Sequence, residues 1–98
     1  MDCKYSLSEK VKKQLILLAE KCGVQKLILF GSRARCSNKP TSDIDLAVSG
    51  GDISRFRCDI DDEIETLLMF DVVNLDEPVQ RELLDSIEKE GVIIYEKV

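Results

Sequence analysis

The sequence predicts a small α/β (α+β) domain in which helices pack against one mixed β-sheet. Segments with helical periodicity alternate with short apolar segments of strand length along the 98 residues. This length fits a single domain that spans residues 1–98. Two of the predicted strands flank a helix, whereas another pair is joined only by a loop. We therefore expect parallel and antiparallel pairs in the same sheet.

The first predicted helix begins at a capping box. Ser6 supplies the hydroxyl of the cap, and Glu9 follows three residues later. Apolar side chains then recur at helical spacing and are expected to face the core: Leu7, Val11, Leu15, Leu18 and Cys22. Gly23 is expected to end the helix. Residues 24–30 finish in a continuous apolar run, which predicts a strand buried on both faces.

The middle of the chain predicts a loop, a strand and a second helix. Residues 31–41 concentrate Gly, Ser, Asn and Pro, which favours a loop with room for one short helical turn. Residues 43–48 alternate between polar and apolar side chains, as strands do, and the glycines at 50 and 51 turn the chain. Asp52 is expected to cap a helix whose buried face carries Ile53, Phe56, Ile60, Ile64 and Leu67.

The last third of the chain predicts a strand, a helix and a final strand. Residues 70–75 form the third predicted strand. Glu77 and Pro78 are expected to open a helix, because proline suits the first helical turn. Its inward-facing side chains are expected to be Val79, Leu83, Leu84 and Ile87. Gly91 ends this helix, and residues 92–95 form the last strand.

The composition narrows the classes of function. The chain is 44% hydrophobic and 34% charged, with a formal net charge of −5 that disfavours general nucleic-acid binding. No apolar run approaches the ~20 residues of a membrane span and no signal peptide is evident, so we expect a cytoplasmic protein. The chain has no histidine, which excludes histidine-based triads and histidine metal sites. The four widely spaced cysteines are expected to be free thiols: Cys3, Cys22, Cys36 and Cys58.

Two aspartates share one face of the strand predicted at residues 43–48. Because side chains alternate along a strand, Asp43 and Asp45 point the same way, with Cα atoms about 6.6 Å apart. Ile44 and Leu46 then point into the core. Two carboxylates at that separation can share divalent ions. An Asp-x-Asp pair taken alone is more often simply solvated, so its surroundings must decide between the two interpretations.

The surroundings include a turn suited to phosphate. Gly31 and Ser32 follow the buried strand, and a glycine backbone with a neighbouring hydroxyl can cradle phosphate oxygens. Arg33, Arg35 and Lys39 lie between this turn and the aspartates and can neutralise phosphate, although a solvated surface position is an equal alternative for the arginines. No Gly-Lys-Ser/Thr follows, so the turn is not a Walker A loop.

A third acid lies later in the chain. Asp71 is flanked by Phe70 and Val72 in an otherwise apolar strand. It is either a strand-end charge that faces water or a third carboxylate beside Asp43 and Asp45.

Together these segments resemble the DNA polymerase beta nucleotidyltransferase superfamily. The resemblance is carried by Leu-Phe-Gly-Ser-Arg-Ala-Arg at 29–35, by Ser-Asp-Ile-Asp-Leu-Ala-Val at 42–48, and by the later Asp71. The Gly-Ser-x10-Asp-x-Asp spacing matches, and the chain is about as long as the domain. Within the superfamily it is most similar to the minimal nucleotidyltransferases, the MNT-domain antitoxins that pair with HEPN-domain toxins. Cys36 departs from the pattern, because many relatives carry glycine there.

The resemblance implies a polymerase-beta-like fold and Mg²⁺-dependent transfer of AMP from ATP to a hydroxyl. Asp43, Asp45 and Asp71 would be the catalytic residues and would ligate two Mg²⁺ ions. The nucleotide would be bound by Gly31, Ser32, Arg33, Arg35 and Ser42, with Arg33 stabilising charge on the pyrophosphate leaving group.

The resemblance also implies an acceptor. It would be a tyrosine hydroxyl of a partner HEPN RNase toxin, so that the chain would act as an antitoxin by AMPylation. Two alternatives remain open. The chain can act as an antitoxin that covers the toxin without catalysis, or as a nucleotidyltransferase that modifies a small molecule or an RNA end.

Overall fold

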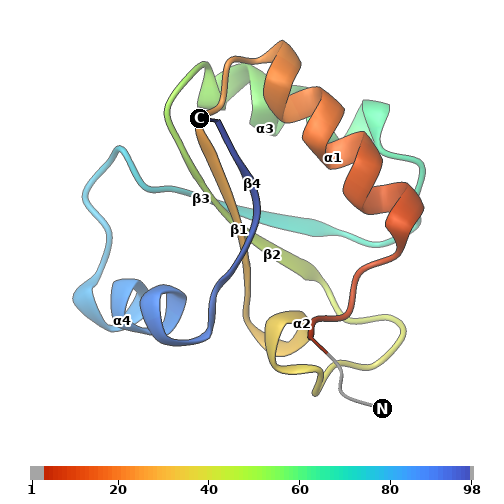
Figure 1. Cartoon of the computed structure of the whole chain (residues 1–98), viewed down its shortest axis with the longest axis vertical. Coiled ribbons are helices and arrows are strands. Elements are labelled where there is room, and N and C mark those ends of the chain that lie inside the picture. Colours follow the sequence, from red (N-terminus) through yellow and green to blue (C-terminus); the bar gives the residue numbers. More distant parts are fainter. Residues whose placement is uncertain (1–3, 98) are drawn as a thin grey trace.

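One four-stranded sheet organises the chain (Figure 1), and the computed structural model describes residues 4–97. Four helices and four strands follow one another in the order expected from the sequence. In chain order they are α1 (Glu9–Lys21), β1 (Lys26–Phe30), α2 (Ser32–Arg35), β2 (Ile44–Ser49), α3 (Ile53–Glu63), β3 (Phe70–Asn74), α4 (Arg81–Glu90) and β4 (Val92–Glu96).

The sheet is mixed, as predicted. Its strand order is β3-β2-β1-β4, with β1 antiparallel to both of its neighbours. The strands β2 and β3, which flank α3, are parallel. In the register of this parallel pair, Asp45 lies opposite Asp71, while on the other side of β2 Phe30 lies opposite Asp45. The pairing therefore brings three segments that are distant in sequence to one end of the sheet.

The sheet separates two apolar layers. The helices α1 and α3 lie together over one face (Figure 1). The largest fully buried side chains belong to this layer: Leu15, Leu18, Val24, Leu27, Leu29, Ile44, Leu46, Val48 and Phe56. On the other face, under α4, a smaller cluster contains Ile28, Phe30, Ala47 and Ile87. Since β1 contributes alternate side chains to both layers, it is buried on both faces, as its continuous apolar run predicts.

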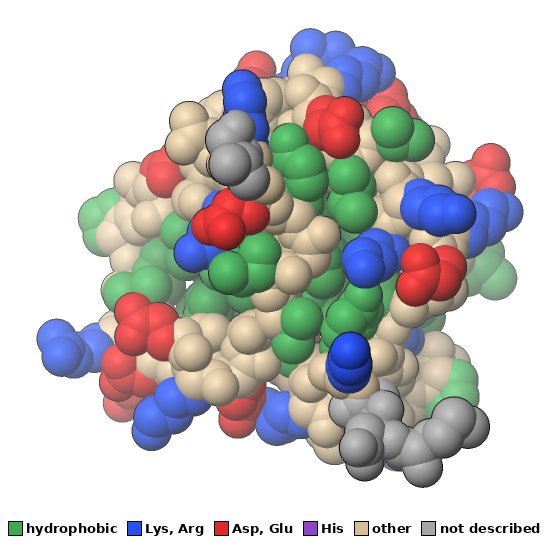
Figure 2. Space-filling model, in the orientation of Figure 1, with side chains coloured by type: hydrophobic (Ala, Val, Ile, Leu, Met, Phe, Trp, Pro, Cys, Tyr) green, Lys and Arg blue, Asp and Glu red, His purple; other side chains and the backbone are tan. Residues whose placement is uncertain are grey.

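Charged side chains are mixed in sign on the face shown in Figure 2. Acidic and basic groups alternate across it, with apolar side chains visible between them. The ion pairs on the described part of the chain are largely exposed, for example Lys10 with Glu65 and Lys21 with Glu63. Such pairs contribute little to stability. No helix within residues 4–97 is long and apolar enough to span a membrane.

The start of α1 differs from the predicted capping box. Ser8, not Ser6, is the cap, and its hydroxyl accepts a hydrogen bond from the amide of Val11. Ser6 is held elsewhere, because its amide donates to the carbonyl of Arg33. Leu7 therefore precedes the helix, although it still packs against the core. The prediction failed because two serines two residues apart offer the same capping chemistry, and a distant contact selects between them.

Two other boundaries were also wrong. Leu67, predicted on the buried face of α3, is 103% exposed, because α3 ends at Glu63 and the hydroxyl of Thr66 then accepts from the amide of Leu68. The last helix begins at Arg81, three residues after Pro78. A turn at Asn74, whose side chain accepts from the amide of Asp76, comes first, and residues 78–80 lie between this turn and the helix.

The cysteines only partly follow the prediction of free thiols. Cys22 is buried with a free thiol, and Cys58 is exposed with a free thiol. Cys36, in contrast, is disulfide-bonded. Cys3 lies outside the described residues. Spacing along the chain could not predict this bond, because a disulfide depends on separation in space.

Candidate active site

Parallel pairing of β2 with β3 brings two carboxylates together. Asp45 and Asp71 are register partners, and residues paired in register on neighbouring strands point to the same face. Ile44 and Leu46 on either side of Asp45 are fully buried against α1 and α3, so both carboxylates lie on the opposite face. Asp43 lies one residue before β2 rather than within it, and it is exposed.

The other two acids influence the carboxyl of Asp45. Partial burial, followed by the negative charges of Asp71 and Asp43, raises the pKa of Asp45 above its ordinary value. The guanidinium of Arg35 acts in the opposite direction and lowers the pKa of the same carboxyl. The end of the sheet thus concentrates negative charge that one nearby arginine only partly offsets. A cation placed there would relieve the repulsion.

Gly31 packs directly against the central carboxylate. A Cβ atom at Gly31 would overlap Oδ2 of Asp45 and would lie 3.2 Å from its Cγ. The backbone of Gly31 has φ 76° and ψ −155°, a region that is essentially restricted to glycine. Ser32 follows as the first residue of α2 and is half-buried. The turn predicted to hold phosphate therefore lies beside the carboxylates, and only glycine fits its first position.

Arg33 is occupied by the protein itself. Its side chain is buried, with 6% of the residue exposed. The guanidinium donates hydrogen bonds to the backbone carbonyls of Ser6, Pro40 and Ser42 at 3.0–3.3 Å. This geometry gives Arg33 a structural role in place of the phosphate contact expected from the sequence. It fixes the loop immediately before Asp43.

Arg35 and Ser42 have different surroundings. Arg35 is half-exposed and forms a 2.6 Å ion pair with Glu90 at the end of α4. The hydroxyl of Ser42 accepts a hydrogen bond from the amide of Lys39 at 2.9 Å, which tightens the loop. Sequence reasoning missed Glu90, because it lies 55 residues from Arg35 along the chain and no motif includes it.

The departure at Cys36 has a conformational explanation. Cys36 follows α2 with φ 61° and ψ 27°, the left-handed conformation, and it is the one residue other than glycine with positive φ in the described part of the chain. Glycine adopts this conformation without a steric penalty. The glycine typical of similar sequences thus matches the backbone seen here, and Cys36 adopts the same turn.

The donor chemistry suits Mg²⁺, which prefers carboxylate oxygens. No group of three acidic, cysteine or histidine side chains within residues 4–97 forms a ready-made metal cage. This is consistent with Mg²⁺ chemistry, since the ion usually binds one or two carboxylates and completes its octahedron with water and substrate phosphates. The residues present therefore fit a metal that arrives with a polyphosphate.

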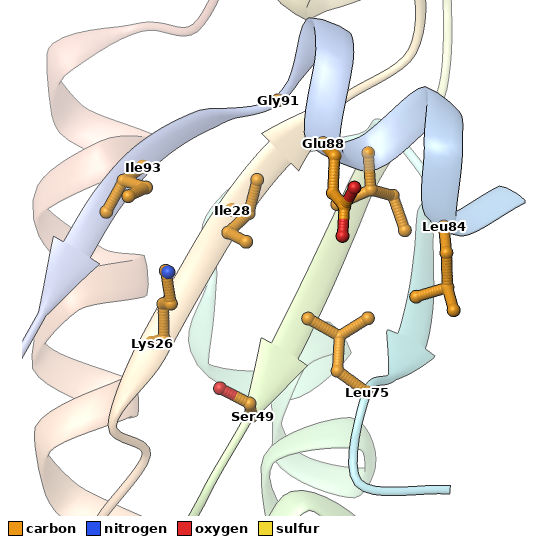
Figure 3. A pocket seen from close by; sticks show the side chains of 9 residues that line it. Lys26, Ile28, Ser49, Leu75, Leu84, Glu88, Gly91 and Ile93 are labelled. Carbon is orange, nitrogen blue, oxygen red and sulfur yellow. The ribbon is translucent and has the colours of Figure 1, made fainter. Parts of the chain in front are cut away.

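A separate cavity of about 420 Å³ lies under α4, on the same sheet face as Asp45 (Figure 3). Ile28, Leu84 and Ile87 form part of its apolar lining, and Lys26 and Glu88 add charge. Ser49, which also lines it, is four residues along β2 from Asp45, or about 13 Å. None of the residues predicted for the site lines this cavity.

Comparison with known proteins gives the same family as the sequence motifs. The family model described as polymerase beta, nucleotidyltransferase, matches residues 9–98. No curated protein sequence matches the chain.

Several solved structures share the fold. One is a toxin–antitoxin with AMP-PNP, with a TM-score of 0.66 and 21% sequence identity; the match covers 88% of this chain and 73% of that chain. Another is a variant of the MntA–HpeT toxin–antitoxin, with a TM-score of 0.67 and 21% sequence identity; the match covers 94% of this chain and 75% of that chain. A third is a protein from Sulfolobus solfataricus that is described as a candidate nucleotidyltransferase. Its TM-score is 0.52 and its sequence identity is 20%; the match covers 90% of this chain and 82% of that chain. At these identities the likeness shows the fold, and the family match identifies the chain as a member of the polymerase beta nucleotidyltransferase family.

Proposed function

We propose that this nucleotidyltransferase transfers AMP from ATP to a hydroxyl group of a partner protein, using Mg²⁺ held by Asp43, Asp45 and Asp71. The observation that carries the proposal is the parallel register of Asp45 with Asp71 beside the Gly31 turn. In this arrangement the carboxylates and the glycine turn lie at one end of the sheet. Both parts are needed to bind a metal–triphosphate complex.

The residues divide the chemistry between them. Gly31 and Ser32 bind the β- and γ-phosphates through backbone amides and a hydroxyl. Asp43 and Asp45 would hold the metal that carries the triphosphate. Asp71 would help to hold a second ion and would accept the proton of the acceptor hydroxyl. When bound, Mg²⁺ supplies positive charge that lowers the pKa of that hydroxyl and stabilises the transition state.

The reaction balances without a further reactant. The acceptor oxygen forms a bond to the α-phosphorus, and the bond between that phosphorus and the bridging oxygen to the β-phosphate breaks. Pyrophosphate leaves, and the hydroxyl proton passes to Asp71. We expect Arg35 to meet phosphate charge, because its side chain is half-exposed and its charge acts on Asp45, whereas Arg33 is bound to backbone carbonyls.

One consideration supports a protein as the acceptor. Solved structures with this fold include toxin–antitoxin complexes, one of them with AMP-PNP. We infer that a HEPN RNase toxin presents a tyrosine hydroxyl to the site.

The test is a mass measurement on the partner. The chain is incubated with ATP, Mg²⁺ and the product of the neighbouring gene, and the intact mass of that product is recorded. We expect a gain of about 329 Da, the mass of one AMP adduct. An unchanged mass after full incubation overturns the proposed transfer.

A variant separates transfer from simple covering of the toxin. Asp43→Asn combined with Asp45→Asn removes the metal-binding charge while preserving size. If neutralisation of the toxin is lost while binding is kept, catalysis is required. Full neutralisation by the variant would show that covering is sufficient.

A further inference from the structure

The Arg35–Glu90 ion pair connects the phosphate turn to a distant helix. Arg35 ends α2, three residues after Ser32, and Glu90 is the last residue of α4. Nη1 of Arg35 lies 2.6 Å from Oε2 of Glu90, and the two side chains are 48% and 35% exposed. An exposed pair of this kind contributes little to stability. Its place beside the carboxylates suggests that it serves another purpose.

The helix end that carries Glu90 is fixed against the sheet. Gly91 follows it directly, and a Cβ there would lie 2.6 Å from Cγ2 of Ile28 on β1. The amide of Gly91 donates to the carbonyl of Ile87 at 2.8 Å. Ile28 and Ile87 are both buried under α4. Because the backbone approaches β1 this closely, the backbone of Glu90 is held in place on the same side of the sheet as Asp45.

The guanidinium of Arg35 keeps donors available while Glu90 holds it. The ion pair uses Nη1, and a guanidinium has five N–H donors in a fixed plane. Arg35 lies in the short helix α2, which begins directly after Gly31, and Gly31 packs against the carboxylate of Asp45. The other arginine of the turn, Arg33, is committed to three backbone carbonyls. Arg35 is therefore the arginine whose orientation can matter to a ligand.

We propose that Glu90 is a positioning residue, which holds the guanidinium of Arg35 beside the carboxylate cluster so that an incoming triphosphate meets a cation that is already oriented. This inference rests on the proposed function, because it requires that the site binds a nucleotide. An arginine side chain loses conformational freedom when it binds phosphate, and an ion pair made beforehand reduces that loss.

The test measures MgATP affinity by titration calorimetry. Glu90→Gln removes the ion pair with little change in size, and we expect the Kd for MgATP to rise about twofold to tenfold. Glu90→Asp keeps a carboxylate and should retain most of the affinity. The matched control is Glu88→Gln, which removes an exposed charge from the same helix and should leave the Kd unchanged. Melting temperatures of all variants should stay close to that of the wild type.

A double-variant cycle shows whether Glu90 acts through Arg35. If it does, Glu90→Gln added to Arg35→Gln should change the Kd no further. The proposal is overturned if Glu90→Gln weakens MgATP binding equally in the wild type and in Arg35→Gln. It is also overturned if Glu90→Gln alone leaves the Kd unchanged. Tighter binding by Glu90→Gln also overturns it, because Glu90 would then compete with phosphate. Failure of the wild type to bind MgATP would instead refute the proposed function, and this inference with it.

Discussion

Replacing Gly31 by alanine tests whether the phosphate turn and the carboxylates form one unit. Two penalties follow from the structure. The backbone at φ 76° and ψ −155° is strained for any other residue, which costs about 1–3 kcal/mol. The added Cβ would also overlap Oδ2 of Asp45, so the carboxylate must move away from the turn. We expect a lower melting temperature together with a loss of Mg²⁺-dependent ATP binding.

The expected shift in melting temperature follows from the cost of the strained backbone. For a domain of this length, 1 kcal/mol corresponds to roughly 4–8 °C, so Gly31→Ala should lower the melting temperature by about 4–24 °C. Differential scanning calorimetry measures this shift, and a titration with MgATP below the transition measures binding. The two together separate loss of stability from displacement of Asp45.

Gly23→Ala is the matched control. Gly23 also has positive φ, at 71°, but a Cβ there would meet nothing within 4 Å. It ends α1 far from the carboxylates, where the amide of Val24 donates to the carbonyl of Ala19. This variant should lose about 1 kcal/mol of stability and keep its affinity for MgATP. If Gly31→Ala bound MgATP as well as Gly23→Ala does, the proposed contact between turn and carboxylate would be refuted.

Three further predictions concern single side chains. Asp45→Asn should stabilise the metal-free protein by up to about 1 kcal/mol after solvent screening, measured by urea denaturation, and should abolish stabilisation by Mg²⁺ with ATP. Because the folded-state pKa of Asp45 is raised, its ionisation should lower the stability of the metal-free wild type as pH rises through and above the ordinary carboxyl range. This fall in stability with rising pH should be absent from Asp45→Asn. An identical pH dependence of stability in the variant and the wild type would contradict the prediction. Arg33→Met should cost roughly 1.5–3 kcal/mol in the same denaturation assay, since it leaves loop carbonyls without their charged donor, and a neutral effect would remove its structural role. Leu67→Ser should change stability by less than ~0.5 kcal/mol because the side chain is fully exposed, whereas a large loss would show that residue 67 is covered.

Much of the fold could be predicted because strand parity is a local property. The apolar run before Gly31 requires burial on both faces, and β1 is buried in this way. The alternation after Asp43 predicts a strand with Ile44 and Leu46 in the core, as observed. Helix boundaries were less predictable. Pro78 is compatible with a first helical turn, but the turn before it is also held by a distant contact, in which the carboxylate of Asp76 accepts from the amide of Gly50.

The candidate site could likewise be predicted only in part. The structure brings the acids and the glycine–serine turn to one edge of the sheet, because β1 ends there while β2 and β3 begin there. Their roles in binding metal and nucleotide stay predictions. Spacing alone grouped these residues. It could not distinguish Arg33 from Arg35, which are two residues apart and chemically identical. The distinction comes from the chain before α1, whose Ser6 carbonyl accepts from Arg33, and from Glu90 at the other end of the sequence. Both are long-range contacts.

The central claim is that the three carboxylates bind divalent metal together with ATP. Its most direct test is electron paramagnetic resonance of Mn²⁺, used in place of Mg²⁺, with an ATP analogue that cannot be cleaved between the α- and β-phosphates. We predict that the wild type binds about two Mn²⁺ ions per chain only when the analogue is present, as a two-metal site requires. Asp45→Asn and Asp71→Asn should each reduce that number. Undiminished Mn²⁺ binding by both variants would contradict the account.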